Sequence, residues 1–388
     1  MALVGRLPPT ADVVIVGGGV IGCATAYFAR HAGLRTLVIE KRAALATLTT
    51  PVATGGFRLQ FDNPEEIELV RESVAFFEQL ARRHDIGLTH QGYLFVSRTP
   101  DGQRQLQTMG RRMMGWGVDV ELMDGEEAQR RFAYLAPNVN AGRFGRQDGW
   151  LDSRRLALAL AAESGADFAL EVAATGFLRQ GDRVTGVQTA AGKVSAPWTV
   201  VATGPLSGPL LATVGLDPGL TTVRRHKLIV PNLPLVPQDA PMTIEVETGA
   251  HWRPGLRGAF GLWTAPAPAE PPAEDVPTSA DFAFGLLNPE SDHALARVTP
   301  FWREAWASPR LQWWLQAGQY TYTPDRRPLL GPSSVDGLAI NTGYSGHGIM
   351  GSIGGSRRAV DAILGRLSPD ANPFRPDRPM VPRAFDVL

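Results

Sequence analysis

Three glycines near the start of the chain, Gly17, Gly19 and Gly22, follow an apolar run over residues 13–16 and precede an alanine-rich stretch. The order predicts a strand, a tight turn and a helix. Each glycine has a reason: the first allows the tight turn, the second lets the backbone approach a pyrophosphate, and the third allows the helix to pack closely on the strand. The phosphates then lie at a helix N-terminus, where N–H groups and the helix dipole favour anions. Because turns without a ligand also show this pattern, it needs support from its surroundings.

Glu40 gives that support. It ends a second predicted strand, residues 35–39, about 20 residues after the glycines, where an acidic side chain accepts hydrogen bonds from the ribose of an adenine dinucleotide. We therefore predict a dinucleotide-binding unit over residues 11–60. NAD enzymes carry this unit at many positions, whereas chains that open with it are often FAD proteins.

Composition limits the class of protein. With 388 residues and 44% apolar side chains, the chain is long enough for a large core and for two domains. Its 38 basic and 38 acidic side chains balance, which argues against nucleic acid or an anionic membrane as a partner. A single cysteine, Cys23, excludes an intramolecular disulfide. No secretory signal and no apolar run of about 18 residues is seen, so we expect a cytoplasmic protein.

Periodicity predicts the elements between these motifs. Apolar residues at helical spacing predict a helix over 64–84, and alternation predicts a strand over 92–97. Further helices are expected at 103–115, 124–132 and 149–165, and further strands at 171–173, 183–189, 198–204 and 338–341. A Pro/Ala/Glu-rich segment, 265–280, is predicted to be a surface loop.

The whole pattern resembles the FAD-dependent amine and amino-acid oxidoreductases of the D-amino-acid oxidase superfamily, above all the branch that includes monomeric sarcosine oxidase. The resemblance covers nearly the whole chain and is most specific in residues 320–331 and 341–350. It implies an α/β fold with a Rossmann-like FAD-binding domain and a substrate domain, α+β, on a mixed or antiparallel sheet. The expected ranges are 1–85, 149–220 and 325–388 for the FAD-binding domain, and 86–148 and 221–324 for the substrate domain.

The resemblance also implies which residues hold FAD. The glycines and Glu40 would hold the pyrophosphate and ribose, Val172 the adenine, and Thr203 and Gly204 would close over the pyrophosphate. The loop 343–348 would aim helix N–H groups at the flavin pyrimidine oxygen, where negative charge accumulates. The full expected set is Gly17, Gly19, Val20, Ile21, Gly22, Glu40, Lys41, Arg42, Gly55, Gly56, Phe57, Val172, Thr203, Gly204, Gly343, Tyr344, Ser345, Gly346, His347, Gly348, Ile349 and Met350. Lys41 and Arg42 fit a solvated charge pair equally well, and Val172, Thr203 and Gly204 fit ordinary sheet positions.

Arg58, in the loop 54–60, matches the family's arginine for the substrate carboxylate, because a guanidinium binds a carboxylate bidentately and stays charged. Tyr320 matches the family's active-site tyrosine beside the flavin. Second choices for the site are Tyr322, Tyr344 and His347, and candidates that would shape substrate choice are His251, Trp252 and Trp263.

The chain also departs from the family pattern. Gly318 stands where monomeric sarcosine oxidases tie the flavin to a cysteine, so we expect non-covalent FAD. Met350 replaces a lysine that pairs with the carboxylate, and residues 260–264 lack the oxygen-activating lysine, which leaves Lys227 as the lysine able to approach the ring. Since positive charge near flavin N5 stabilises developing superoxide, oxygen and an electron-transfer partner both remain open as acceptors.

These features predict oxidation of a small secondary amino acid by hydride transfer to flavin N5, with sarcosine oxidase the first candidate: sarcosine, oxygen and water would give glycine, formaldehyde and hydrogen peroxide. L-Proline, dimethylglycine or a D-amino acid are the alternative substrates, for an oxidase or a dehydrogenase. A non-catalytic FAD-binding assembly protein is the alternative from another class, and a pyridine-nucleotide dehydrogenase is disfavoured by the C-terminal loop and helix. We expect a monomer or a small homo-oligomer.

Overall fold

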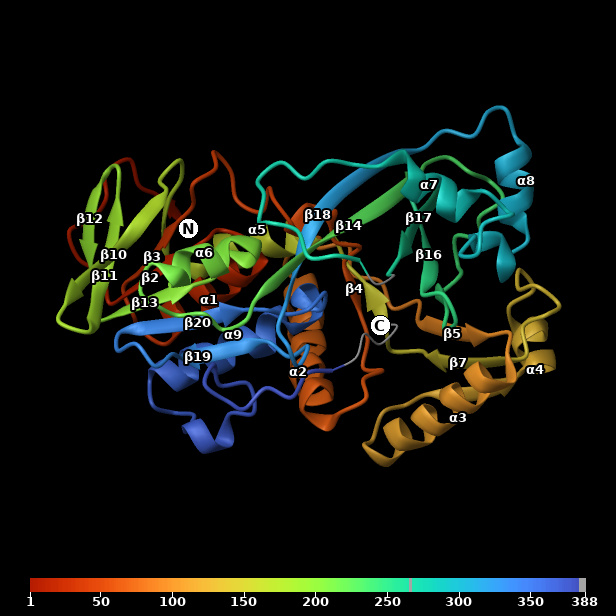
Figure 1. Ribbon diagram of the computed structural model, residues 1–388, viewed down its shortest axis with the longest axis horizontal. Coiled ribbons are helices and arrows are strands. Elements are labelled where there is room, and N and C mark those ends of the chain that lie inside the picture. The colour runs from red at the N-terminus through yellow and green to blue at the C-terminus, as the bar shows by residue number, and fades with distance from the viewer. Residues whose placement is uncertain (265–266, 384–388) are drawn as a thin grey trace.

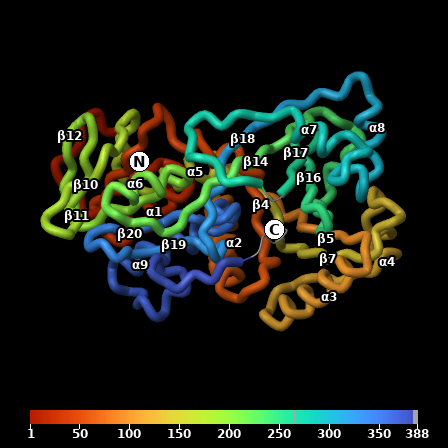
Figure 2. Tube along the Cα trace, in the orientation of Figure 1, coloured from red at the N-terminus to blue at the C-terminus, as the bar shows by residue number. Residues whose placement is uncertain are grey.

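The computed structural model describes residues 1–264 and 267–383, and its two large β-sheets lie next to each other along the long axis of the molecule (Figure 1). Two long antiparallel strands, β14 (Thr221–Val230) and β18 (Trp314–Tyr322), run from the second sheet towards the first (Figure 2). These two strands therefore carry side chains of the second sheet to the edge of the first.

The first sheet has seven strands in the order β1-β9-β3-β2-β13-β20-β19, and every pair is parallel except β19 with β20. The strands are β1 (Ala2–Leu3), β2 (Val13–Val16), β3 (Thr36–Ile39), β9 (Asp167–Ala169), β13 (Trp198–Val201), β19 (Leu329–Pro332) and β20 (Leu338–Thr342). Both β2 and β3 are buried along their whole length, as expected of a parallel sheet covered on both faces.

Helices cover one face of this sheet, and a small sheet covers the other. The helices are α1 (Val20–His31), α5 (Ser153–Ser164) and α9 (Gly348–Ile363), with α2 (Pro64–Ala81) packed on α9. The small antiparallel sheet consists of β10 (Ala174–Gln180), β11 (Arg183–Thr189) and β12 (Gly192–Ser195). Its Val187 and Val194 pack against Val14 and Leu37 of the large sheet. The apolar side chains on both faces of the large sheet are therefore buried.

The second sheet has eight strands in the order β18-β14-β17-β16-β15-β5-β7-β6, and only its β15–β5 pair is parallel among the described pairs. Its other strands are β5 (Tyr93–Ser97), β6 (Glu121–Asp124), β7 (Ala141–Gly145), β15 (Met242–Glu245), β16 (Ala250–Gly255) and β17 (Gly258–Trp263). Trp252 and Trp302 are fully buried between this sheet and the helices α7 (Ala280–Leu287) and α8 (Phe301–Ala307).

The architecture confirms the predicted α/β fold class with a mixed, mainly antiparallel second sheet. The strands of the first sheet all fall within 1–85, 149–220 and 325–388, and those of the second within 86–148 and 221–324. The remaining helices are α3 (Pro100–Gly115), α4 (Gly125–Arg131) and α6 (Ser207–Ala212). Among the described residues, no helix has the length and apolar character needed to cross a bilayer.

Three local predictions were wrong or only partly testable. Residues 149–150 form β8 (Gly149–Trp150), paired with β4 (Gly56–Phe57), and the helix starts later because the Asp152 side chain caps its first turn. The predicted strand at 171–173 is instead the connection between β9 and β10. The described residues 267–279 form no helix or strand, in line with the predicted loop, and 265 and 266 lie outside the described residues.

A buried ion pair fixes the turn that follows β18. Asp325 accepts two hydrogen bonds from Arg378, at 2.8 and 2.9 Å, and both side chains are less than a tenth exposed. Burial alone would raise the pKa of Asp325, but the Arg378 hydrogen bonds and charge outweigh it and hold that pKa below its ordinary value. The pair ties the tail of the chain to the turn.

We expect Arg378→Met to lower the free energy of unfolding by about 3 kcal/mol, because it leaves a buried carboxylate without its cation. Urea unfolding of the FAD-loaded protein at pH 7 measures this. Since the folded pKa of Asp325 is depressed, the loss should shrink as the pH falls through that pKa. The control is Arg375→Met, whose more exposed ion pairs to Asp370 and Asp377 predict a change near zero. Equal effects of the two variants would contradict a special role for Arg378.

Candidate active site

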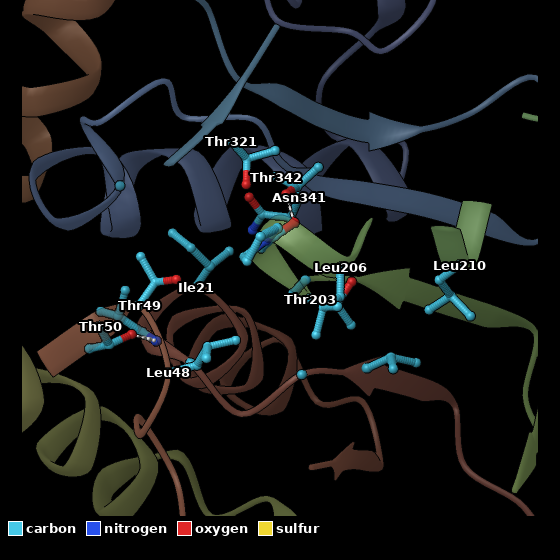
Figure 3. Close-up of a pocket in the computed structure, with 18 of the residues that line it drawn as sticks. Ile21, Leu48, Thr49, Thr50, Thr203, Leu206, Leu210, Thr321, Asn341 and Thr342 are labelled. Atoms are coloured by element: carbon cyan, nitrogen blue, oxygen red, sulfur yellow. Dashed lines mark hydrogen bonds between the residues drawn. The ribbon is translucent and has the colours of Figure 1, made fainter. Parts of the chain in front are cut away.

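A cavity of about 440 Å³ runs along the carboxyl ends of β2, β3, β13 and β20. In Figure 3, Thr49 and Thr50 line it from the segment after β3, Thr203 and Leu206 from the segment after β13, and Thr342 from the end of β20. The carboxyl ends of parallel strands are where α/β sheets bind their ligands. We refer to this space as the first cavity.

Two glycines of the turn after β2 lie too close to neighbouring backbone atoms to carry a side chain. Gly17 has a φ of +108°, and a Cβ added there would lie 2.6 Å from the carbonyl oxygen of Ala202. A Cβ on Gly22 would lie only 1.8 Å from the carbonyl oxygen of Gly17. A Cβ on Gly19 would meet only Thr50 Oγ1, at 3.4 Å, and Gly19 itself lines the first cavity. The turn thus presents backbone, and the N-terminus of α1, to the cavity.

Cys23 lies in the first turn of α1 beneath this site. The side chain is fully buried, and burial raises the pKa of its thiol to about 12. The thiol is therefore protonated at neutral pH and serves as packing.

Glu40 is held in place by the backbone around it. One carboxylate oxygen accepts from the Gly18 N–H at 2.7 Å, and the other accepts from the Arg42 N–H at 2.8 Å. A carboxylate has further lone pairs, so each oxygen can still accept from a ribose hydroxyl. Val172 donates its own N–H to the carbonyl oxygen of Glu40 at 3.0 Å and lines the cavity beyond it.

At the other end of the first cavity, the turn 343–348 leads into α9. Gly343, Ser345 and Gly346 have φ values of +74°, +52° and +97°, and a Cβ on Gly346 would lie 2.9 Å from the Tyr320 ring. The turn therefore packs directly on Tyr320, and α9 begins at the cavity wall without a side-chain cap. A long cavity with a glycine turn, a fixed carboxylate and a helix N-terminus at each end fits FAD.

A second cavity of about 570 Å³ adjoins the first. Five residues line both of them: Ala53, Tyr320, Ser345, Gly346 and Ile349. The two spaces therefore meet at Tyr320 and the turn before α9, which is where a flavin ring held in the first cavity would face a substrate in the second.

Arg58 lines the second cavity and is only 2% exposed. One of its guanidinium nitrogens donates to the carbonyl oxygen of Gln60, and the other lies 3.3 Å from His347 Nε2. The guanidinium also lies over the Phe61 ring, 4.4 Å from its centre. Arg58 is thus a buried cation with a fixed direction.

Asp148 holds the loop that carries Arg58. It accepts from the Leu59 N–H at 2.8 Å and from Gln60 Nε2 at 2.7 Å. Burial raises the pKa of Asp148 to about 6, because desolvation disfavours the carboxylate. The loop position therefore depends on a buried network rather than on a secondary-structure ladder.

His347 lies between Arg58 and Glu66. Its Nδ1 is 3.8 Å from Glu66 Oε1, too far for a hydrogen bond. Burial lowers the pKa of His347, so the ring is neutral at neutral pH and its Nε2 can accept from the Arg58 guanidinium. A neutral ring at this position avoids a second cation directly beside Arg58.

The structure brings most of the predicted residues to these two cavities. Those lining the first are Gly17, Gly19, Val20, Ile21, Glu40, Lys41, Arg42, Val172, Thr203, Gly204, Tyr320, Gly343, Tyr344, Ser345, Gly346, Gly348 and Ile349. Those lining the second are Gly55, Gly56, Arg58, His251, Trp263, Tyr320, Tyr322, Ser345, Gly346, His347, Ile349 and Met350. Tyr344 also donates its hydroxyl to Asn341 Oδ1 at 2.6 Å, which ties it to the sheet.

Four predicted residues line neither cavity. Gly22 lies beneath the glycine turn, Phe57 packs on Phe77, and Trp252 belongs to the apolar core below α8. Lys227 donates to the carbonyl oxygen of Pro51 at 2.9 Å, and burial lowers its pKa to about 8. Its observed role is to hold the turn before Ala53, and the structure does not bring it to the wall where the cavities meet.

Arginines that sequence reasoning missed also line the second cavity: Arg143, Arg225, Arg326 and Arg383. Arg225 stands directly opposite Gly318 in the pairing of β14 with β18, on the face that carries Tyr320 and Tyr322. Strand alternation gives the faces of one strand, but only the register between the two strands reveals that these residues share a cavity.

Comparison with known proteins agrees with this geometry. The family model described as FAD dependent oxidoreductase matches residues 12–362. A Xenopus laevis FAD-dependent oxidoreductase domain-containing protein 1 is 28% identical, over 93% of this chain and 80% of its own length. Mitochondrial dimethylglycine dehydrogenase of Mus musculus is 25% identical over 91% of this chain, which spans only 42% of that protein.

Solved structures share the fold. L-Proline dehydrogenase from P. horikoshii has a TM-score of 0.84 and 22% identity, covering 95% of this chain and 98% of that one. Glycine oxidase from Geobacillus kaustophilus has a TM-score of 0.82 and 23% identity, covering 96% and 100%. At such identities the likeness establishes the fold alone.

We expect Gly22→Ala to weaken FAD binding by about tenfold or more and to cost about 2–3 kcal/mol of folding free energy. The added methyl group would push the Gly17 carbonyl and with it the phosphate turn. FAD titration of the apoprotein by fluorescence, with thermal unfolding of the loaded protein, measures both quantities. Gly115→Ala, at the end of α3 where a Cβ meets nothing within 4 Å, is the matched control. Unchanged FAD affinity in Gly22→Ala would contradict the assignment of the turn.

Proposed function

This chain belongs to the FAD-dependent oxidoreductase family, and from that premise we propose that it oxidises a small amino acid bearing a secondary amine, with sarcosine as the first candidate. The observation that carries the proposal is the buried guanidinium of Arg58 in the second cavity, next to the wall that this cavity shares with the first. An amino acid is the small molecule whose carboxylate such a cation would take and whose carbon–nitrogen bond a flavin enzyme would oxidise.

Arg58 binds the carboxylate of the substrate. Its side chain is held by Gln60 and by the neutral His347, so the guanidinium does not need to reorganise when the anion enters. In a buried site, a bidentate arginine–carboxylate pair is stronger and more directional than a lysine contact. Met350, which lines the same cavity, contributes apolar surface where the resemblance to monomeric sarcosine oxidase implies a lysine.

Tyr320 positions the amine end. It lines both cavities, and burial raises the pKa of its hydroxyl to about 12, so the phenol keeps its proton at neutral pH. A protonated phenol can donate to the lone pair of a neutral amine or to a carboxylate oxygen. Apolar side chains around it, Ile349, Leu262 and Met350 among them, limit the water that reaches the reacting carbon.

The reaction needs no base with a dedicated proton-relay partner. FAD, when bound, supplies the acceptor for a hydride. The carbon–hydrogen electron pair leaves the N-methyl or α-carbon, the nitrogen lone pair forms the C=N bond, and water hydrolyses the imine to an amine and an aldehyde. For sarcosine, oxidation at the N-methyl carbon gives glycine and formaldehyde. The task of the protein is therefore to bind, orient and desolvate the amino acid.

Other amino acids fit the same proposal less specifically. The names of two relatives, L-proline dehydrogenase and dimethylglycine dehydrogenase, make proline and dimethylglycine the next substrates to test. The electron acceptor is oxygen in the sarcosine oxidase form of the proposal and a partner protein in the dehydrogenase form. The place of Lys227, against Pro51 and outside both cavities, gives the oxidase form no support from a cation at the flavin.

The experiment is anaerobic mixing of the FAD-loaded protein with sarcosine while the oxidised-flavin absorption band is followed, and then admission of air with a peroxide assay. Bleaching followed by recovery with peroxide supports a sarcosine oxidase. Bleaching that persists in air supports a dehydrogenase. If sarcosine, L-proline, dimethylglycine and a panel of D-amino acids all leave the band unchanged, the proposal is overturned in favour of a non-catalytic FAD-binding protein.

We expect Arg58→Met to reduce kcat/KM for the best amino acid by at least about 100-fold, since removal of one partner of a buried charge pair costs about 2–5 kcal/mol. Steady-state or stopped-flow flavin reduction measures it, and FAD content and thermal unfolding check the fold. The kcat/KM of Arg58→Lys should fall between those of the wild-type protein and Arg58→Met, because lysine keeps the charge but not the bidentate geometry. The control is Arg146→Met, an exposed arginine that lines neither cavity. Wild-type kcat/KM in Arg58→Met would show that the carboxylate binds elsewhere.

A further inference from the structure

Three histidines line the second cavity, and two of them already use their acceptor nitrogen within the protein. His226 Nε2 accepts from the Ser279 N–H at 3.1 Å, and His347 Nε2 lies 3.3 Å from a guanidinium nitrogen of Arg58. Burial lowers the pKa of both rings, so both are neutral at neutral pH. A neutral imidazole has one acceptor nitrogen, and the other nitrogen carries the proton. Neither ring therefore has an acceptor left for a ligand.

The third histidine, His251 on β16, uses its nitrogens the other way round. Its Nδ1 lies 2.8 Å from the carbonyl oxygen of Gly249, and because a carbonyl oxygen only accepts, Nδ1 carries the proton. Burial lowers the pKa of His251 to about 4, so this ring is also neutral at neutral pH. The tautomer is thus fixed by the backbone, and the lone pair lies on Nε2.

This lone pair is open to the second cavity. Within residues 1–264 and 267–383, His251 Nε2 makes no hydrogen bond, yet it is not one of the fully enclosed side-chain atoms that lack a partner. The residue as a whole is only 5% exposed, and the second cavity is the space that it lines. Buried acceptors in proteins are normally hydrogen-bonded, so Nε2 is suited to a donor on a ligand.

The second sheet places His251 in one row with the residue beside Arg58. His251 stands opposite Ile244 of β15, and Ile244 stands opposite Phe95 of β5. Residues directly opposite each other share a face of the sheet, and both His251 and Phe95 line the second cavity. The Arg58 guanidinium lies 5.9 Å from the centre of the Phe95 ring. Arg58 and His251 therefore approach the cavity over the same face of the sheet.

The distance across this row suits an amino acid. One strand, β15, separates β16 from β5, so these two strands lie about 10 Å apart. A carboxylate bound at Arg58 and an amine bound at His251 require two hydrogen bonds of about 2.9 Å and the roughly 3 Å between the carboxylate and the nitrogen, which is about 9 Å in all. One amino acid can therefore contact both side chains.

We propose that His251 Nε2 accepts a hydrogen bond from the N–H of the substrate amine and selects amines that keep an N–H in their neutral form. The inference rests on the proposed function, because it names the substrate class for the same cavity. Primary and secondary amines keep such an N–H, whereas a neutral tertiary amine has none. Sarcosine and L-proline are then inside the substrate class, and dimethylglycine is outside it.

The hydrogen bond to His251 becomes stronger during the reaction. The neutral amine loses hydride from carbon to the acceptor that FAD supplies, its nitrogen lone pair becomes the C=N bond, and the nitrogen becomes positively charged while its N–H stays in place. A positively charged nitrogen makes the N–H a stronger donor. An interaction that is stronger in the transition state than in the bound substrate raises kcat. A tertiary amine gains nothing from His251 at this step.

The binding test compares two unreactive ligands of the same net charge and similar shape. Pyrrole-2-carboxylate has a ring N–H next to its carboxylate, and furan-2-carboxylate has at that position a ring oxygen, which only accepts. Titration of the FAD-loaded protein is followed by the flavin difference spectrum and by calorimetry. We expect pyrrole-2-carboxylate to bind at least about tenfold more tightly. Equal affinities, or tighter binding of furan-2-carboxylate, would overturn the inference.

His251→Phe tests whether His251 is the acceptor. It keeps a ring and removes the Nε2 lone pair, so we expect the preference for pyrrole-2-carboxylate to fall below about threefold. His90→Phe is the matched control and should keep the full preference: His90 Nδ1 also donates to a backbone carbonyl, that of Gln147 at 2.7 Å, but His90 lines neither cavity. His251→Leu gives a second reading if His251→Phe does not fold. A full preference in either folded variant would overturn the assignment.

Turnover extends the test to the amines themselves. Each secondary amino acid is paired with its N-methyl derivative, sarcosine with dimethylglycine and L-proline with N-methylproline, and anaerobic flavin reduction is followed. We expect kcat/KM of the tertiary amine to be at least about 100-fold lower. In His251→Phe this ratio should shrink at least about tenfold. A purely steric barrier to the extra methyl group would leave the ratio unchanged in His251→Phe, and that result would overturn the inference.

The same measurements separate this inference from the function on which it rests. Reduction of the flavin by both members of a pair with similar kcat/KM would overturn the inference and leave the proposed function standing. A preference for pyrrole-2-carboxylate that depends on His251, without flavin reduction by any of these amines, would overturn the proposed function and support His251 as an acceptor for an N–H donor.

Discussion

The site depends on the packing of the turn 343–348 against Tyr320. Gly346 lies so close to the Tyr320 ring that a Cβ there would come within 2.9 Å of it, and this turn also starts α9. Tyr320 belongs to β18 of the second sheet, while α9 packs on the first sheet with α1 and α2. This contact therefore lies where the first cavity meets the second, and residues of both sheets line the space around it.

The loop that carries Arg58 is positioned in a different way, by hydrogen bonds to a buried side chain. It forms only the two-residue strand β4, and its position comes from the buried Asp148, which bonds Leu59 and Gln60 at once. Gln60 in turn accepts hydrogen bonds from Arg143 and Arg58, and so helps to fix both side chains. A buried cation needs hydrogen bonds from the protein, and here the buried carboxylate of Asp148 orients the loop that supplies them.

The sequence predicted the parts of this arrangement that are local. The glycine turn and the loop before α9 each follow a strand and precede a helix, and Glu40 follows the next strand along the chain. Their spacing alone therefore placed them at one sheet edge, and the structure brings them to one cavity. The contact of Arg225 with Tyr322 was beyond sequence reasoning, because the two residues are separated by about a hundred residues and meet only through the register of β14 with β18. The contact of Lys227 with Pro51 could not be predicted either, because it depends on the tertiary packing of the turn 50–52.

The buried state of Cys23 has a practical consequence for spectroscopy. It is the one cysteine of the chain, its side chain is shielded from solvent, and its thiol is almost wholly protonated at neutral pH. Maleimide or nitroxide reagents require an accessible thiolate, so we expect the natural chain not to react with them. A cysteine introduced on α3 and another on α9 would then carry a fluorophore pair without removal of any native residue, and distance changes between the two sheets could be followed while the cavities fill.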